Sequence, residues 1–183
     1  MAKISFRYGA VGSSKTANML MIRYNFIERG KNVILLKPKM ENRDGATIIK
    51  SRIGLEAECE FVEDYLNNIR KTNCILIDEA QFLTIEQIDK FVEIADNLDI
   101  PIIMFGLKND FTGHLFEGSK RIIEIADELQ EITTICWCGK KARFTTRIKD
   151  GKVVKTGPII LLGGNESYTA LCRKHYNLNM LGG

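Results

Sequence analysis

Apolar and polar residues form two kinds of segment over the first two thirds of the chain. Four short apolar runs, each rich in Ile, Val or Phe, have the length of a buried strand. They occupy residues 4–8, 33–36, 74–77 and 102–105. Between them, residues 16–29 and 85–98 carry apolar side chains at helical spacing. This alternation predicts an α/β fold in which helices cover a parallel sheet.

The pattern changes at about residue 132. Residues 143–148 alternate in character, residues 149–152 form a turn signal, and residues 153–155 continue as a second short run, which together predict a small β-hairpin flanked by cysteines. We therefore divide the chain into an α/β domain of residues 1–131 and a smaller module of residues 132–183. We expect the tail after His175, residues 176–183, to be frayed.

Length and charge limit the class of protein. A chain of 183 residues is near the size of one ordinary domain, so a large multidomain machine is excluded. Lys and Arg total 26 against 23 Asp and Glu, and a net charge of +3 is too small for a polybasic nucleic-acid arm. The longest apolar runs are far below the roughly 20 residues that cross a bilayer. We expect no nucleic-acid partner and no membrane partner.

The first residues lack the basic and apolar regions of a signal peptide, so we expect a cytoplasmic, reducing location. In that compartment, the five cysteines of the chain are better interpreted as thiols or metal ligands than as disulfides. Two of them, Cys59 and Cys74, have apolar neighbours and are interpreted as small core residues. His114 lies between Gly113 and Leu115 and is interpreted as a loop or packing residue.

A phosphate-loop pattern follows the first predicted strand. It consists of Gly9, Ala10, Val11, Gly12, Ser13, Ser14, Lys15 and Thr16. In such a loop, small residues let backbone N–H groups converge on phosphate oxygens, a lysine bridges the outer phosphates, and a hydroxyl binds Mg²⁺. Ser14 stands where the motif has glycine, so its Cβ would crowd the phosphate or require a different φ. A polar turn capped by serine would also suit these residues.

A carboxylate pair follows the third predicted strand. Asp78 and Glu79 would lie at the carboxyl edge of a parallel sheet, where α/β proteins bind ligands. There Asp78 would face Mg²⁺, and Glu79 would accept a proton from an attacking hydroxyl during phosphoryl transfer. A solvated turn or a helix cap is the alternative, and the phosphate loop on the first strand favours the nucleotide site.

Two ligand pairs flank the predicted hairpin. Cys136 and Cys138 precede it, and Cys172 and His175 follow it, which supplies the four donors that tetrahedral zinc needs. Because only Trp137 separates the first pair, its side chain must point outward while both sulfurs turn inward. Buried cysteines with a surface histidine are the alternative.

A zinc ion at that position would fix the ends of a loop over residues 157–171. Gly163 and Gly164 followed by Tyr168 describe a flexible lid with one aromatic side chain, able to close on a small ligand. An architectural role is therefore expected for the zinc, since the module lacks the interleaved basic and aromatic residues of nucleic-acid stacking surfaces.

Together these motifs resemble the thymidine kinases of the tetrameric, zinc-containing class. The resemblance spans the chain in order and rests on the phosphate loop, on residues 78–82, on Gly106-Leu107 with Asp110-Phe111, on the cysteine pairs, and on residues 163–168. It implies a P-loop (RecA-like) parallel sheet with flanking helices and a small C-terminal zinc-binding hairpin, or lasso, domain. It further implies a cytoplasmic homotetramer that is inhibited by thymidine triphosphate.

The resemblance also implies transfer of the γ-phosphoryl of MgATP to the 5′-hydroxyl of thymidine. Glu79 corresponds to the general base, and Lys15, Thr16, Asp78 and Gln81 join the phosphate loop in binding the nucleotide. The substrate-binding residues it implies are Arg43, Phe111, Ile160, Leu161, Leu162, Gly163, Gly164 and Tyr168. Zinc ligands carry over as Cys136, Cys138, Cys172 and His175.

Three residues depart from the family pattern: Ser14, Val11 where methionine is frequent, and Glu41 where many relatives have aspartate. We expect altered nucleotide affinity with activity retained, because Lys15 and Glu79 are present.

A second class of protein remains open, namely a degenerate P-loop and zinc-ribbon protein that senses nucleotides or binds a partner without turnover. A nucleic-acid-stimulated ATPase would need basic stripes and a longer chain. For Arg43, the alternative to a substrate-binding role is a solvated surface residue.

Overall fold

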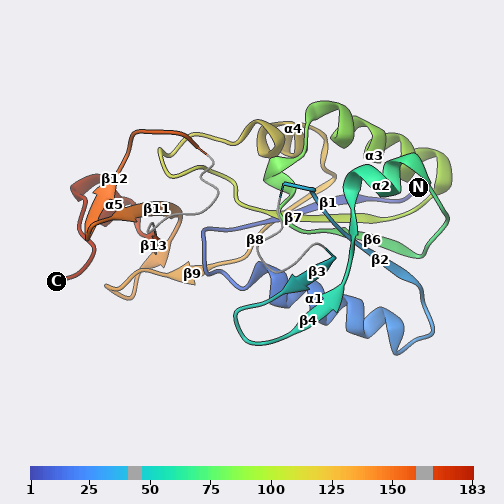
Figure 1. The fold of residues 1–183 in the computed structure, drawn as a ribbon, viewed down its shortest axis with the longest axis horizontal. Helices are drawn as coiled ribbons and strands as arrows, with labels where there is room; N and C mark the ends of the chain where they lie inside the picture. The colour runs from blue at the N-terminus through green and yellow to red at the C-terminus, as the bar shows by residue number, and fades with distance from the viewer. Residues whose placement is uncertain (41–46, 160–166) are drawn as a thin grey trace.

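A parallel sheet lies at the centre of the computed structural model, which describes residues 1–40, 47–159 and 167–183 (Figure 1). Within these ranges its strands follow the order β5-β2-β6-β7-β1-β8, and every neighbouring pair is parallel. The strands are β1 (Ile4–Tyr8), β2 (Val33–Lys37), β5 (Glu60–Phe61), β6 (Cys74–Ile77), β7 (Ile102–Gly106) and β8 (Glu128–Glu131). The predicted α/β fold is confirmed, and all four predicted strands are present.

Helices cover both faces of this sheet. Figure 1 shows α1 on one face and α2, α3 and α4 on the other. The helices are α1 (Lys15–Ile27), α2 (Val62–Asn67), α3 (Ile85–Leu98), α4 (Glu117–Ile125) and α5 (Arg173–Leu178), with a short 3₁₀ turn η1 (Ala80–Phe82). The predicted helix over residues 85–98 is therefore confirmed with its bounds. Among the described residues, none of these helices has the length and apolarity to cross a bilayer.

Helix α3 illustrates how the apolar spacing produces the packing. Ile88, Phe91 and Ala95 recur at helical spacing and are buried in the cluster on the sheet face that also carries Tyr65 of α2. The rings of Tyr65 and Phe91 are parallel, with centroids 6.4 Å apart. Burial of a side chain the size of Phe91 stabilises the fold by about 1.5–3 kcal/mol.

Smaller antiparallel units accompany the sheet. The hairpin β3 (Ile48–Lys50) and β4 (Glu56–Glu58) packs Ile49 into the core on the α1 side. The C-terminal part contains β9 (Thr134–Ile135), β10 (Lys141–Ala142), β11 (Phe144–Lys149), β12 (Lys152–Val154) and β13 (Ser167–Leu171). Strands β11 and β12 confirm the predicted hairpin, and β13 pairs with β11 on its other side. This part has an apolar cluster of its own, at the far end of the molecule from the N-terminus (Figure 1).

The expectation of a frayed tail after His175 is wrong for its first residues. Helix α5 continues to Leu178, and Tyr176 is buried. The Tyr176 ring stacks on Phe144 with centroids 4.5 Å apart, and its hydroxyl donates a hydrogen bond of 2.9 Å to the carbonyl of Phe111. Both partners are distant in the sequence, so local pattern could not reveal that this residue is anchored.

The register of the central strands determines where the site forms. Tyr8 pairs with Gly106 and Ile77 pairs with Met104, so β1, β6 and β7 end at the same edge of the sheet. The segment that follows β1 carries the phosphate loop, the segment that follows β6 carries the acidic motif, and the segment that follows β7 begins at Leu107. The topology therefore brings together residues separated by about a third of the chain.

We predict that replacing Thr84 with alanine destabilises the protein by about 1 kcal/mol. Thr84 caps α3, because its hydroxyl accepts the N–H of Gln87 at 3.2 Å while the Gln87 side chain accepts the N–H of Thr84 at 3.0 Å. Urea denaturation gives the free energy of unfolding, and Thr84→Ser serves as the control that keeps the hydroxyl. Equal stability of the alanine and serine variants would contradict this assignment of the cap.

Candidate active site

The phosphate loop connects β1 to α1 and is closely packed at its base. The N–H of Gly9 donates to the carbonyl of Gly106 at 3.3 Å, which ties the start of the loop to the end of β7. A Cβ on Gly9 would lie only 2.3 Å from the carbonyl oxygen of Ile132 and 2.4 Å from Oγ of Ser13, so glycine is required there. The predicted turn after β1 is thus a tight loop at the N-terminus of a helix.

Ser14 keeps the backbone conformation that glycine would favour. Its φ is +59° and its ψ is +28°, in the left-handed region, and its side chain makes no capping hydrogen bond to α1. A residue with a Cβ in that region costs about 1–2 kcal/mol relative to the right-handed conformation. Of the two consequences expected for Ser14, a different φ is therefore not observed.

Lys15 folds back over the loop it belongs to. Its Nζ donates to the carbonyl of Ala10 at 2.9 Å and lies 3.3 Å from Oγ of Ser13. The side chain is buried, and this burial lowers the pKa of Lys15, while the nearby carboxylates of Glu79 and Asp78 act in the opposite direction. The charges of the phosphate loop and of the acidic strand end therefore act on one another directly.

Thr16 and Asp78 join the two motifs. The Thr16 hydroxyl donates a hydrogen bond of 2.9 Å to Oδ2 of Asp78, and Oδ1 of Asp78 accepts the N–H of Glu79 at 3.0 Å. Burial, together with the charge of Glu79, raises the pKa of Asp78 above its usual range. A hydroxyl and a carboxylate in contact beside a phosphate loop are oxygen ligands of the type that Mg²⁺ prefers, so these residues suit a divalent cation.

Glu79 is held in position by Gln81. The Gln81 amide donates from Nε2 to Oε2 of Glu79, and its Oε1 accepts the N–H of Leu107 at 2.9 Å. A Cβ on Gly106 would lie 2.6 Å from Oε1 of Gln81, so the glycine at the end of β7 makes room for this amide. Glu79 itself has a left-handed backbone, with φ of +50°. Its carboxylate is thus positioned by contacts that reach the neighbouring strand end.

One cavity of about 610 Å³ collects these side chains. Among the residues predicted to form the site, those that line it are Val11, Gly12, Ser13, Ser14, Lys15, Thr16, Asp78, Glu79, Gln81, Phe111 and Tyr168. Gly9 and Ala10 lie at the base of the loop, beside a small neighbouring hollow. The predicted residues Arg43, Ile160, Leu161, Leu162, Gly163 and Gly164 lie outside the residues that the structure describes.

Two arginines near this cavity were not predicted. Arg52, in the turn between β3 and β4, lines the cavity on the side of the phosphate loop, and its guanidinium lies 3.7 Å from where a Cβ on Gly12 would be. Arg147, in β11, is buried beneath Phe111 and Tyr168. Neither belongs to a motif, because an arginine in a polar turn or in an alternating strand is typical of a solvated surface.

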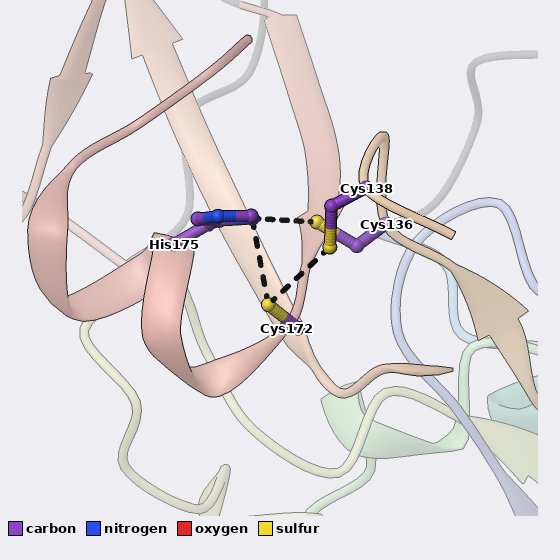
Figure 2. Close-up of side chains that lie close together, drawn as sticks. All are labelled: Cys136, Cys138, Cys172 and His175. Atoms are coloured by element: carbon purple, nitrogen blue, oxygen red, sulfur yellow. Dashed lines mark hydrogen bonds between the residues drawn. The ribbon is translucent and has the colours of Figure 1, made fainter. Parts of the chain in front are cut away.

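The four predicted metal ligands come together in the C-terminal part. Figure 2 shows Cys136 and Cys138 facing Cys172 and His175, and the ligand atoms of all four lie within 4.8 Å of one another. Nδ1 of His175 is 3.4 Å from Sγ of Cys136 and 3.5 Å from Sγ of Cys172. Because Zn–S bonds of about 2.3 Å and Zn–N bonds of about 2.0 Å place tetrahedral ligands at such separations, this donor set suits zinc.

The surrounding residues orient these ligands. Cys172 is the N-cap residue of α5 and His175 lies within this short helix, so both residues would face a bound ion. Trp137 points outward, as predicted, with 44% of its surface exposed, and its ring stacks on His175 with centroids 4.3 Å apart. Its Nε1 donates to the carbonyl of Met180 at 3.2 Å. Cys59 and Cys74 are buried core residues, as predicted. His114 lies outside helices and strands and is exposed, so of its two interpretations the loop residue is the one observed.

The parallel sheet, the phosphate loop and the acidic strand end define a P-loop nucleotide-binding protein. A family model described as thymidine kinase matches residues 2–176. Thymidine kinase of Lactococcus lactis is 44% identical over 96% of this chain and 97% of its own, and that of Lactiplantibacillus plantarum is 46% identical over 96% of both chains. The protein described here belongs to the thymidine kinase family.

Solved structures give a weaker similarity. AMPPCP-bound DnaA from Aquifex aeolicus superposes with a TM-score of 0.45 and 18% sequence identity, over 72% of this chain and 41% of that chain. A similarity of that size says nothing about activity.

We predict that Ser14→Gly stabilises the protein. Glycine adopts the left-handed backbone without the steric cost, and this gain exceeds its larger loss of chain entropy by up to about 1 kcal/mol. Urea denaturation measures the change in the free energy of unfolding. Ser14→Ala is the matched control, since alanine removes the hydroxyl but keeps the Cβ, and it is expected to give no gain. A glycine variant that is less stable than the alanine variant contradicts the prediction.

We predict that the purified protein contains about one zinc ion per chain and that Cys172→Ser loses it. Because the sequence has a single tryptophan and Trp137 stacks on His175, removal of the ion by a chelator should change tryptophan fluorescence while the far-ultraviolet circular dichroism is largely kept. Cys59→Ala, outside the cluster, is the control that retains the metal. Simultaneous loss of fluorescence and helical signals would contradict independent stability of the parallel sheet.

Proposed function

We propose that this protein phosphorylates thymidine at the 5′-hydroxyl with MgATP, giving thymidine monophosphate and ADP in nucleoside salvage for DNA synthesis. Membership of the thymidine kinase family supports this reaction. The observation that carries the proposal is the placement of Glu79 on the same cavity as Lys15 and Thr16. Transfer of a phosphoryl group to a hydroxyl requires a proton acceptor and a positively charged group that binds phosphate, and Glu79 and Lys15 supply these in one cavity.

The nucleotide half of the site is assigned to the phosphate loop and the acidic strand end. Backbone N–H groups of residues 9–16 and the Lys15 ammonium would bind the triphosphate. Thr16 and Asp78 would hold Mg²⁺, which, when bound, neutralises charge on the transferring phosphoryl group. Gln81 is assigned to the same half, and its contact with Glu79 supports a second role in orienting the carboxylate.

The chemical step needs one proton acceptor. The 5′-hydroxyl of thymidine loses its proton to the carboxylate of Glu79 as its oxygen forms a bond to the γ-phosphorus, and the bond from that phosphorus to the β,γ-bridging oxygen breaks. ADP leaves with the electron pair of the broken bond. Lys15 would stabilise the negative charge on the phosphate oxygens throughout.

The nucleoside half is assigned to the aromatic and lasso residues. Phe111 and Tyr168 would pack on the thymine ring, and Arg43 would support the base or a phosphate. The main chain over residues 160–164 would bind the pyrimidine edge, with Cys136, Cys138, Cys172 and His175 fixing this loop through zinc. We place the boundary between the nucleotide-binding domain and the zinc-binding domain between residues 131 and 132.

Assembly and regulation follow from family membership alone. We propose a cytoplasmic homotetramer in which thymidine triphosphate inhibits by occupying the same site. A sensor without turnover is not favoured, because a protein that only senses nucleotides has no need for a held carboxylate beside the Mg²⁺ ligands. Production of thymidine monophosphate from thymidine, ATP and Mg²⁺, followed by mass spectrometry, tests the reaction directly.

We predict that Glu79→Gln lowers kcat by about 10²-fold or more while the KM values for ATP and thymidine change little. Glutamine has the same shape and can still accept the hydrogen bond from Gln81, but it cannot take a proton. The matched control is Glu93→Gln, an exposed position on α3, which is expected to leave kcat unchanged. A Glu79→Gln variant with wild-type kcat would exclude Glu79 as the base.

A further inference from the structure

Arg147 is a buried charge that none of the roles above uses. It lies in the middle of β11 and is 1% exposed, which makes it the largest fully buried side chain among the described residues. Removing a guanidinium from water costs several kcal/mol unless hydrogen bonds and stacking compensate. Its contacts therefore indicate why an arginine is placed there.

The Arg147 guanidinium connects three separate segments. Its Nε donates to the hydroxyl of Tyr168 at 3.0 Å, and its Nη2 donates to the carbonyl of Ile159 at 3.0 Å. Its Cζ lies 3.6 Å from the centre of the Phe111 ring. Arg147 and Tyr168 are paired across β11 and β13, whereas Phe111 follows β7 of the parallel sheet. One side chain thus contacts both aromatic walls of the cavity.

Two residues of the C-terminal part hold Phe111: Arg147 contacts its ring and Tyr176 contacts its backbone. Tyr176 donates its hydroxyl to the Phe111 carbonyl at 2.9 Å, while Arg147 covers the ring. Asp110 holds the following turn, since its Oδ1 accepts the N–H of Thr112 at 2.8 Å. The backbone of Phe111 is therefore fixed, and the Arg147 guanidinium defines the space that the ring occupies.

Arg147 contacts residues that line the cavity but does not line the cavity itself. Phe111, Tyr168 and Ile159 all line the cavity, and Arg147 is absent from the described residues that line it. A flat guanidinium can stack on one ring and donate in its own plane to two acceptors at once, which neither lysine nor methionine can do. The side chain is therefore suited to fixing the separation of Phe111 from Tyr168.

We propose that Arg147 is a positioning residue that holds Phe111 and Tyr168 at the spacing needed to enclose the nucleoside base. The proposal rests on the function proposed above, because it takes the two aromatic residues as the base-binding walls. It assigns Arg147 to affinity for the nucleoside and not to binding of the triphosphate. The effect should therefore appear in the KM for thymidine and leave the KM for ATP within about twofold.

We expect Arg147→Met to raise the KM for thymidine about tenfold, the change that corresponds to loss of one stacked cation with its hydrogen bonds. Arg147→Lys keeps the positive charge but not the planar guanidinium, so it should give an intermediate KM for thymidine. Arg143→Met is the matched control, since Arg143 precedes the same strand but its side chain is 60% exposed beside Glu131. This control should keep the wild-type KM.

A double-mutant cycle separates positioning from general support of the fold. Tyr168→Phe removes the hydroxyl that Arg147 contacts and should raise the KM for thymidine about threefold, with no further increase in the Arg147→Met background. Zinc content and Trp137 fluorescence should match wild type in every variant. If Arg147→Met does not fold, the cycle with Arg147→Lys decides, and the Tyr168→Phe effect should then be partly retained.

Three results would overturn the proposal: an unchanged thymidine KM in Arg147→Met, a parallel rise in both KM values with loss of zinc, or an undiminished Tyr168→Phe effect in the double variant. If wild type makes no thymidine monophosphate, the proposed reaction is wrong. In that case calorimetric binding of thymidine to the same variants replaces KM, and absence of binding to wild type overturns this inference as well.

Discussion

Parallel pairing of β1, β6 and β7 is the constraint on which the site depends. Because the three strands end at one edge of the sheet, the segments after them meet there whatever their distance in the sequence. The first segment supplies Lys15, the second supplies Asp78 and Glu79, and the third supplies the N–H of Leu107 that holds Gln81. A different register of β7 would move that N–H and leave the Glu79 carboxylate without its support.

A second constraint comes from one face of β11. Thr145 and Arg147 are two residues apart, so their side chains leave the strand on the same side. Oγ1 of Thr145 accepts the N–H of Val11 at 3.1 Å, and Arg147 covers Phe111. The C-terminal part thus contacts both the phosphate loop and an aromatic wall through a single strand. A metal ion bound by the cysteine and histidine cluster of the same C-terminal part would make the position of β11 dependent on ion binding.

The elements that the sequence predicted share a physical reason. Buried parallel strands must be apolar along their whole length, so residues 74–77 and 102–105 were recognisable without knowledge of their partners. The metal cluster was predictable because few residue types bind zinc and both pairs flank one hairpin. Arg147 and Tyr176 were not predictable, because their partners come from distant segments and no local pattern distinguishes a buried arginine from a solvated one.

Backbone strain is concentrated where ligands would bind. Five residues other than glycine have positive φ within the described ranges, and three of them, Asp99, Asp150 and Asn179, are of the types that tolerate this conformation in turns and caps. The other two are Ser14 and Glu79, each at a cost of about 1–2 kcal/mol. Both residues line the cavity. The strained conformations that reduce stability therefore lie at the candidate site. In the phosphate loop, the conformation that a glycine would adopt is kept although the glycine itself is not. The backbone of Ser14 therefore gives no reason to regard the loop as degenerate, because N–H groups that bind phosphate are oriented by φ and ψ. Crowding of a bound phosphate by the Cβ of Ser14 stays a prediction.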